Sequence, residues 1–302
     1  MTGFTLDEAM VERMAHAALA EDRAHDDVTA AALVPPGQTG RAVIIARAEG
    51  VLAGLPVARA VFAVAGGSLA WRPALEDGAR LSPGDTIATI EGSLSPIVRA
   101  ERVALNYLTH LSGVATAAAA IVRALEGSGC QLRDTRKTIP GLRALEKYAV
   151  CVGGGTNHRM TLADGVLVKD NHLAALRARG LGVADAVRLA REANPGMTIE
   201  IEVTTLDEAR EAIEAGADEL LLDNMSPDLM REVVALAAER DPRPILEASG
   251  NITIDNARTI AETGVDFVSS GAITHSAKAL DMSLEVEGTP SPPAPLPQAG
   301  EG

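Results

Sequence analysis

The chain has 302 residues, a formal net charge of −14 and an aromatic content of only 2%. This length accommodates one large or two medium domains with a substantial buried core. An acidic chain without a basic stripe interleaved with aromatic residues is not expected to bind nucleic acid, and so few aromatic rings exclude extensive base stacking.

The cysteines and the apolar runs place further limits on the class of protein. Cys130 and Cys151 have neither CxxC nor zinc-ligand spacing, so they are expected to be reduced core residues. No apolar run is expected to reach membrane-spanning length, and residues 1–20 predict an amphipathic helix rather than a signal peptide. We therefore expect a cytoplasmic protein without a membrane partner.

The first domain is predicted over residues 1–111 as an α+β unit. The acidic stretch at 21–29 is interpreted as a structural turn rather than a metal site. An Ala-rich helix is expected over 96–125, with an interruption near Ser112 and Gly113. Apolar periodicity predicts the earlier elements in this order: a helix (6–21), a strand (39–49), a helix (52–65) and a β-hairpin (71–92).

The second domain is predicted over residues 112–275, where short apolar strands alternate with amphipathic helices. This alternation implies parallel strands with right-handed crossovers. No GxGxxG follows the first strand, so an α/β barrel is favoured over a dinucleotide-binding sheet. The predicted strands are 131–134, 166–169, 198–203, 219–223, 245–248 and 267–270.

Polar residues lie at or just beyond the carboxyl end of each predicted strand. Catalytic groups of α/β barrels come from that rim, so this pattern predicts a site there. Glu200 is expected on the opposite face of its strand from Glu202, which makes it the weaker candidate. The rim residues are Asp134, Arg136, Lys169, Asp170, Glu202, Asp223, Asn224, Ser249 and Ser270.

Residues 134–172 hold a local excess of cationic side chains in an anionic chain. Arg143, Glu146 and Lys147 have the spacing of a solvated helix face. The other cations fall at strand ends and in loops, which indicates a concave site for a small, multiply charged anion. They are Arg136, Lys137, Arg159 and Lys169, with His158 and His172 nearby.

The motifs in this segment are DTRKT followed by PGLR, then GGG followed by NHR, then KDNH. In this order and spacing they closely resemble the quinolinate phosphoribosyltransferases, and the resemblance runs from about residue 19 to 284. It implies an incomplete, seven-stranded α/β barrel, with an N-terminal α+β sandwich domain that packs against the barrel of a partner. We expect residues 276–287 to return to the first domain and the Pro-rich residues 288–302 to form a disordered tail.

The resemblance implies that the rim transfers the phosphoribosyl group of phosphoribosyl pyrophosphate to quinolinate with decarboxylation, giving nicotinate mononucleotide, pyrophosphate and CO₂ in de novo NAD biosynthesis. Arg136 and Arg159 supply planar guanidinium groups that bind carboxylates through two hydrogen bonds, with Lys137 and His158 as further donors. This cluster suits quinolinate, which has two carboxylates, better than nicotinate, which has one. The resemblance implies that Arg102 joins them from the neighbouring subunit of a homodimer with shared active sites. It also implies a 5-phosphate site for phosphoribosyl pyrophosphate at Ser249, Gly250, Ser270 and Gly271.

Lys169, Glu202 and Asp223 are expected to act at the sugar end. Carboxylates placed near the ribose stabilise positive charge that develops there, and Lys169 is expected to contact the pyrophosphate or ribose. Mg²⁺ is the expected cofactor, carried by the substrate pyrophosphate, with Glu202 and Asp223 as candidate ligands. The predicted catalytic residues are therefore Lys137, Lys169, Glu202 and Asp223.

Three other interpretations remain open from the sequence. A lysine that ends a barrel strand, such as Lys169, also resembles the Schiff-base residue of class I aldolases. The chain is also similar to the molybdenum-associated relatives of the family, or it could be a non-catalytic anion-binding relative. His172 and His275 are expected to be helix-capping or structural residues.

Overall fold

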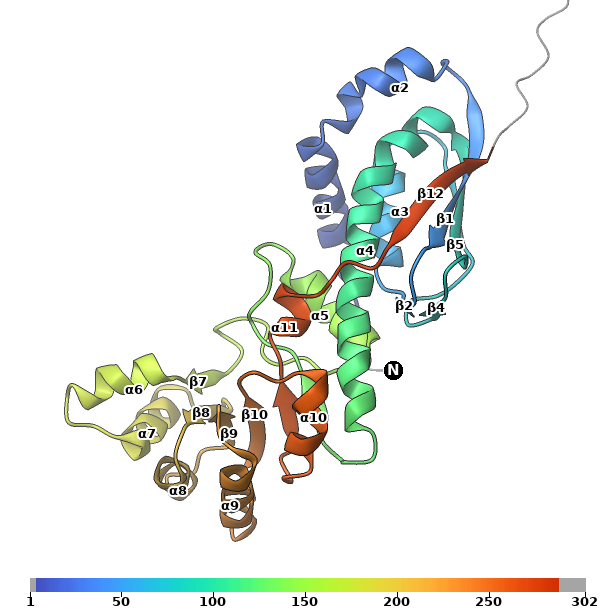
Figure 1. Cartoon of the computed structure of the whole chain (residues 1–302). Helices are drawn as coiled ribbons and strands as arrows, with labels where there is room; N and C mark the ends of the chain where they lie inside the picture. The colour runs from blue at the N-terminus through green and yellow to red at the C-terminus, as the bar shows by residue number, and fades with distance from the viewer. Residues whose placement is uncertain (1–3, 288–302) are drawn as a thin grey trace, which may run out of the picture.

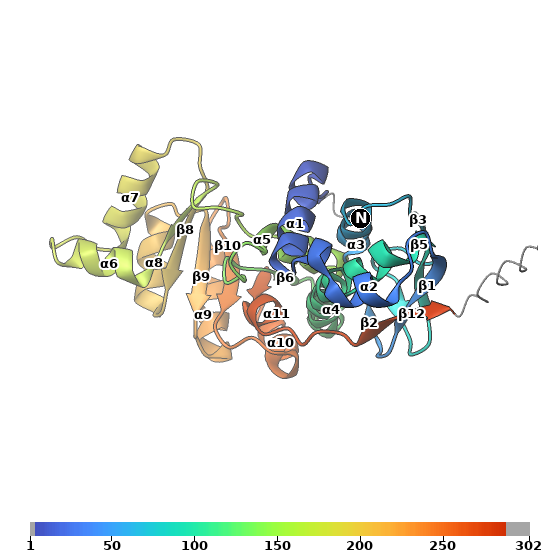
Figure 2. The ribbon, with the colours of Figure 1, turned by 90° about the horizontal axis from the view of Figure 1, so that it is seen from above.

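The computed structural model describes residues 4–287, which form two parts joined by one long helix, α4 (Figure 1). Seen from above, the molecule is elongated, with α6 and α7 at one end and β1 and β12 at the other (Figure 2). The predicted tail at 288–302 lies outside the described residues.

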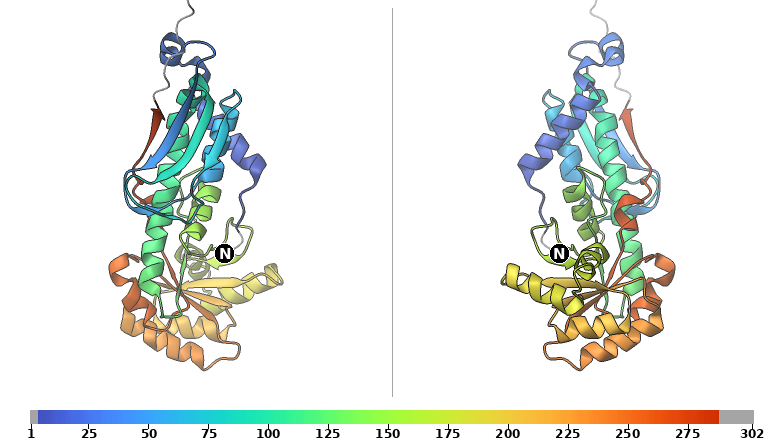
Figure 3. Two further views of the ribbon diagram at one scale, coloured as in Figure 1. Left: turned by 90° about the vertical axis from the view of Figure 1, so that its right-hand side faces the viewer. Right: turned by 90° about the vertical axis from the view of Figure 1, so that its left-hand side faces the viewer.

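The N-terminal part is built on a four-stranded antiparallel sheet in the order β12-β1-β5-β3. β12 comes from the end of the described chain and pairs with β1, so residues far apart in sequence share this sheet (Figure 3). Apolar side chains from the sheet, α1, α3 and α4 form one core. The strands are β1 (Thr39–Ala46), β3 (Ala70–Pro73), β5 (Thr86–Ser93) and β12 (Met282–Glu287), with a small pair β2 (Gly50–Val51) and β4 (Arg80–Leu81).

Helix α4 (Leu94–Leu125) is continuous over 32 residues, so the interruption expected near Ser112 and Gly113 is wrong. Ser112 is buried, and its hydroxyl bonds to the backbone of Ala53 instead of breaking the helix. Gly113 is required for a close approach, because a Cβ there would lie 2.3 Å from the carbonyl oxygen of Lys278. Both residues therefore serve helix packing.

The length and composition of α4 would also allow it to cross a membrane, contrary to the expectation that no such run exists. Half of its most apolar window is buried inside the protein. The helix packs on α3 in the N-terminal part and on α5 and α10 in the other, and this explains its apolar composition.

The C-terminal part is an incomplete α/β barrel, as predicted. Six parallel strands pair in the order β6-β11-β10-β9-β8-β7. A seventh segment makes only one parallel bridge, between Arg133 and Thr156, so the ring stays open between Thr156 and β7. The strands are β6 (Gln131–Arg133), β7 (Val166–Val168), β8 (Ile199–Val203), β9 (Glu219–Asp223), β10 (Ile245–Ser249) and β11 (Phe267–Ser269).

Helices α6 to α9 cover the outer side of β7 to β10 (Figures 1 and 2). In β8, Ile199, Ile201 and Val203 are fully buried in the core, and Glu200 and Glu202 alternate with them. The helices are α1 (Glu8–Glu21), α2 (Val28–Leu33), α3 (Leu55–Val64), α5 (Arg143–Val152), α6 (Asp170–Arg177), α7 (Val183–Ala193), α8 (Leu206–Glu214), α9 (Pro227–Ala238), α10 (Ile254–Ala261) and α11 (Ala272–His275), with a 3-10 turn η1 (Ala24–Asp26).

Candidate active site

A cavity of about 240 Å³ lies at the carboxyl ends of the barrel strands. Most of the predicted site residues line it, because parallel strands bring their carboxyl ends to one rim. Cations and carboxylates therefore face the same small volume. The lining residues are Asp134, Thr135, Arg136, Lys137, His158, Arg159, Leu167, Lys169, Glu202, Leu221, Asp223, Glu247, Ser249 and Ser269.

A larger cavity of about 850 Å³ lies elsewhere, between the N-terminal sheet and Tyr148 of α5. Its walls are mainly apolar, with Phe62 and Trp71 among them, and Arg59 is its one cationic side chain. Size alone is a poor guide here, since a site needs convergent polar groups. The smaller rim cavity is the stronger candidate.

Three of the residues predicted to bind phosphate support the rim without lining the cavity. Ser270 is engaged within the protein, because its hydroxyl donates to the carbonyl of Ile252 at 3.1 Å. Gly250 has φ +99°, and a Cβ there would lie 2.2 Å from Oδ1 of Asn224. A Cβ on Gly271 would lie 2.8 Å from Cδ of Lys137, so Gly271 leaves room for that lysine.

Arg102 does not line the rim cavity of its own chain. Its side chain is 66% exposed on α4, and its nearest acidic partner is Glu101 at 4.0 Å. It lines a separate hollow with Asn106 and His110. This position leaves Arg102 accessible to another molecule.

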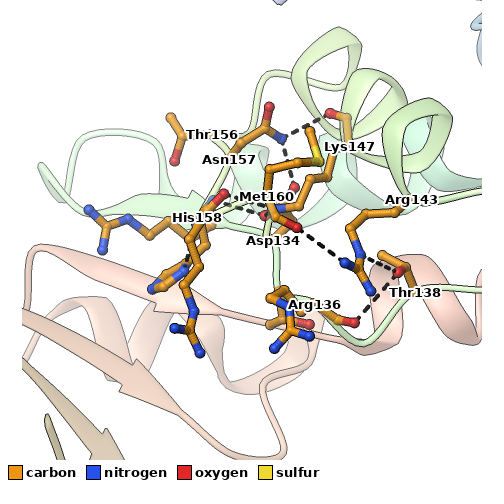
Figure 4. A network of polar contacts seen from close by, with 12 residues as sticks. Asp134, Arg136, Thr138, Arg143, Lys147, Thr156, Asn157, His158 and Met160 are labelled. Atoms are coloured by element: carbon orange, nitrogen blue, oxygen red, sulfur yellow. Dashed lines mark hydrogen bonds and ion pairs between the residues drawn. The ribbon is translucent and has the colours of Figure 1, made fainter. Parts of the chain in front are cut away.

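The interpretation of Glu146 and Lys147 as a solvated helix face is wrong, because both side chains are fully buried. Glu146 accepts hydrogen bonds from the His110 ring at 2.9 Å and from the Ile139 N–H at 3.1 Å. Lys147 forms an ion pair with Asp134 (Figure 4). Burial raises the pKa of Asp134 and lowers that of Lys147, and the attraction between the two charges opposes both shifts.

The placement of Glu200 is also corrected. Residues two apart on a strand share a face, so Glu200 points into the barrel on the same side as Glu202, one layer deeper. Its Oε2 lies 2.8 Å from Nε2 of His158. Counting the strand period correctly would have identified this residue from the sequence.

Arg133, Glu219 and Glu247 were not singled out from the sequence. Arg133 Nη1 donates to Glu219 at 2.7 Å and to Glu247 at 2.9 Å, and its guanidinium stacks over the Phe267 ring at 3.6 Å. With His158 and Glu200 they form the floor of the barrel beneath the rim. For Glu219 and Glu247 the available signal was their even spacing from the rim residues Asp223 and Ser249 on the same strands.

The charges of the rim act on one another. Burial raises the pKa of Glu202 above its ordinary value, the charge of Asp223 raises it further, and Lys169 partly offsets both. Burial and the neighbouring Arg136 lower the pKa of the Arg159 guanidinium. Like charges are thus held close together at both ends of the cavity, which favours a ligand that carries both an anionic and a cationic region.

The floor offers a grouping that could hold a metal ion, since donor atoms of His158, Glu200 and Glu247 lie within 4.8 Å of one another. Nδ1 of His158 accepts the Arg159 N–H at 2.8 Å. The ring proton therefore lies on Nε2 and points to Glu200, which leaves no lone pair for a cation. Burial would lower the pKa of His158, but the hydrogen bond and charge of Glu200 raise it overall.

The rim fits Mg²⁺ better than the floor does. Glu202 and Asp223 present carboxylate oxygens to the cavity, and oxygen is the ligand that Mg²⁺ prefers. The charge of Asp223 disfavours ionisation of Glu202, so a cation beside them would favour the ionised form of Glu202. Asn224 donates to Asp223 Oδ2 at 2.8 Å and orients that carboxylate.

Comparison with known proteins agrees with this geometry. Residues 27–112 match the family model described as quinolinate phosphoribosyl transferase, N-terminal domain, and residues 114–285 match the C-terminal domain. The chain belongs to the quinolinate phosphoribosyl transferase family. The family resemblance expected from the sequence is thereby confirmed.

The curated relatives of this chain include proteins named nicotinate-nucleotide pyrophosphorylase [carboxylating]. The chain is 41% identical to that of Mycobacterium leprae over 86% of this chain and 91% of the relative. It is 40% identical to the human protein over 88% of each chain. A crystal structure of a NadC deletion mutant superposes with a TM-score of 0.89 at 39% identity, covering 95% of this chain and all of the other.

A second solved structure, the nicotinate-nucleotide pyrophosphorylase of Francisella tularensis, has a TM-score of 0.87 at 37% identity and covers 94% of this chain and 98% of its own. These similarities extend over both parts of the molecule. None of them favours the aldolase interpretation of Lys169.

Proposed function

We propose that the protein transfers the phosphoribosyl group of phosphoribosyl pyrophosphate to quinolinate and releases CO₂, giving nicotinate mononucleotide and pyrophosphate for the de novo synthesis of NAD. The observation that carries this proposal is the convergence of Arg136, Lys137 and Arg159 with Glu202 and Asp223 on one cavity. The names of the family and of its relatives agree with it.

The cationic end of the cavity suits the two carboxylates of quinolinate. Arginine binds a carboxylate through two parallel hydrogen bonds, and Lys137 adds a point charge. Nicotinate would leave one cationic group without its partner. A site built to bind a polar group commonly rejects an analogue that lacks it by about 10⁴-fold in kcat/KM. His158 lines the same cavity, but both of its ring nitrogens already have partners in the protein.

The acidic end suits the ribose. As the C1–pyrophosphate bond breaks, positive charge develops on the ring, and Glu202 and Asp223 stabilise it. The pyridine nitrogen then forms the new bond to C1. Glu202 and Asp223 would hold Mg²⁺ carried by the pyrophosphate, and the ion would neutralise the departing group. Lys169 lines the cavity with these two carboxylates and is placed to bind the pyrophosphate oxygens.

Decarboxylation requires no additional electron acceptor. After glycosyl transfer the ring nitrogen is cationic, so the electron pair left at C2 when the bond to CO₂ breaks is stabilised by the adjacent charge. A proton then replaces CO₂ at C2. Arg136 and Lys137 bind the carboxylate until it leaves as neutral CO₂, and its negative charge remains as the electron pair at C2.

The 5-phosphate is assigned to the loops after β10 and β11. Ser249 lines the cavity, and Gly250, Ser270 and Gly271 continue the two loops toward the starts of α10 and α11. Backbone N–H groups near the end of barrel strands commonly bind phosphate.

We further propose a cytoplasmic homodimer in which Arg102 completes the site of the partner. The support is that Arg102 is exposed and lies away from the rim cavity of its own chain. Subunits with Arg102→Ala mixed with subunits with Lys137→Ala should regain part of the activity, because one site of each hybrid dimer is intact. No recovery after proven subunit exchange would place Arg102 outside the site.

The decisive experiment incubates the purified protein with quinolinate, phosphoribosyl pyrophosphate and Mg²⁺. We expect equal amounts of CO₂ and nicotinate mononucleotide, and a far lower rate with nicotinate. If neither CO₂ nor nicotinate mononucleotide forms, the proposed function is wrong. Tight quinolinate binding without products would instead indicate a non-catalytic anion-binding relative, and covalent trapping of Lys169 by borohydride with a carbonyl substrate would indicate an aldolase.

A further inference from the structure

Two separate segments supply the cations that face the proposed dicarboxylate. The first segment, residues 134–138, follows β6 and carries Arg136 and Lys137. The second segment, residues 157–159, follows the bridge at Thr156 and carries His158 and Arg159. Arg136 and Arg159 are close enough for the charge of one to disfavour the charge of the other. Without an anion between them, electrostatic repulsion favours separation of the segments.

A buried ion pair holds the two segments together. Lys147 reaches from α5 to Oδ1 of Asp134, and neither side chain has any exposed surface. Nζ of Lys147 also donates to the carbonyl oxygen of His158 at 2.9 Å. One ammonium group therefore contacts the start of the first segment and the middle of the second (Figure 4).

Asp134 completes the connection from the other side. Its Oδ1 accepts the His158 N–H at 2.8 Å, and its Oδ2 accepts Nδ2 of Asn157 at 2.6 Å. Asn157 Nδ2 also donates to the backbone carbonyl of Lys147 at 3.0 Å. These contacts hold the start of the first segment against Asn157 and His158 of the second, just before Arg136 and Arg159, which line the cavity.

We propose that Lys147 is a positioning residue for dicarboxylate recognition, and that its ion pair with Asp134 keeps the cationic segments at the spacing of two adjacent carboxylates. This inference rests on the proposed function. Lys147 touches no substrate, since it lies behind the cavity wall and does not line it. Its effect is to preorganise the site, so that binding energy is not spent on drawing like charges together.

A purely structural role predicts a different outcome. Replacing both members of a buried ion pair by uncharged residues of similar volume is often neutral for stability, whereas removing one member is strongly destabilising. The informative variant is therefore the double substitution Lys147→Met with Asp134→Asn, which leaves no unpaired buried charge. The matched control is Tyr148→Phe, which removes a 2.6 Å hydrogen bond to Asp77 from the next residue of α5, on the face toward the N-terminal part.

The test measures thermal stability, calorimetric affinity for quinolinate and for phosphoribosyl pyrophosphate, and the rate ratio of quinolinate to nicotinate. In the double variant we expect quinolinate to bind about 10- to 100-fold more weakly, by analogy with the range found when residues that orient metal ligands are removed. Affinity for phosphoribosyl pyrophosphate should stay within about threefold, and the quinolinate-to-nicotinate ratio should fall. Tyr148→Phe should leave both affinities and the ratio unchanged.

A folded double variant with the affinity and selectivity of the native protein would overturn the inference. Equal weakening of both substrates would also overturn it, because it would show a general structural effect. If the double variant does not fold, Lys147→Arg, which keeps a cation beside Asp134 but changes its geometry, must show the same selective loss for the inference to stand. Failure of the proposed function is seen separately, as an absence of quinolinate binding to the native protein.

Discussion

The rim and the floor of the barrel are two layers of charged residues on the same strands, and they differ in where their partners are. On β8, Glu202 belongs to the rim and Glu200 to the floor, on one face of the strand. Glu200 is hydrogen-bonded to His158, whereas Glu202 forms no ion pair within residues 4–287. A glutamate of the same strand thus stabilises the fold in the floor, whereas another faces the cavity in the rim.

Other members of each layer follow the same division, except that Asp134 of the rim is paired with the buried Lys147. In the floor, Arg133 is paired with Glu219 and Glu247. In the rim, Arg136, Lys137 and Lys169 form no ion pair with any residue that the structure describes. Charges already satisfied inside the protein stabilise a fold, and charges left facing a cavity are available to a ligand.

The largest expected effect is on catalysis from the rim residue Glu202. Glu202→Gln keeps the shape of the side chain but removes the charge that stabilises the developing positive ribose. We expect kcat to fall by about 10²- to 10³-fold, the loss typical of removing one preorganised electrostatic group, with an unchanged melting temperature. Steady-state kinetics and thermal denaturation measure the two quantities.

The matched variant in the floor is Glu200→Gln, which retains an acceptor for His158. It should reduce kcat far less than Glu202→Gln does. Equal losses of kcat in the two variants would contradict the division between rim and floor.

The next effect concerns stability of the floor. Arg133→Met leaves Glu219 and Glu247 without their buried cation, so the free energy of unfolding should fall by about 3–5 kcal/mol. Arg136→Met in the rim removes a cation that has no buried acidic partner among the described residues. It should lower activity without a comparable loss in the free energy of unfolding. Chemical denaturation compares the two, and an equally destabilised Arg136→Met would show that the rim also supports the fold.

The sequence predicted the rim well because its signal is simple. A parallel strand must end at the active face, so a polar residue after an apolar run identifies Lys169 or Asp223 without knowledge of packing. Arg133, Glu219 and Glu247 of the floor were not predicted, because their pairing becomes visible only when strands distant in sequence are brought together. For Glu200, the error was in counting the strand period.

Helix patterns were harder to interpret. The spacing of Arg143, Glu146 and Lys147 is the same whether a charged face meets water or buried partners on other segments, and only the fold shows that Asp134 and His110 are those partners. Ser112 and Gly113 looked like a helix break because the close approach of Lys278 is not visible in sequence. The role of Arg102 remains a prediction, since it depends on a second chain.

The smallest expected effect refines the electrostatics of the rim through Asp170, an exposed residue at the start of α6. Its charge raises the pKa of Glu202, while its backbone N–H lowers it and is retained on substitution. Because Glu202 must be ionised to act, kcat should fall as the pH drops through its raised pKa. Asp170→Asn removes a negative neighbour, so the pKa of Glu202 falls and the acidic limb of the kcat profile moves to lower pH. The shift should be less than about one pH unit, given that one unit corresponds to about 1.4 kcal/mol.

A pH profile of kcat at saturating Mg²⁺ measures the shift. Asp207→Asn, in the first turn of α8, is the control and is expected to leave the profile in place. A shift to higher pH in Asp170→Asn would show that the ionisation controlling turnover belongs to another group.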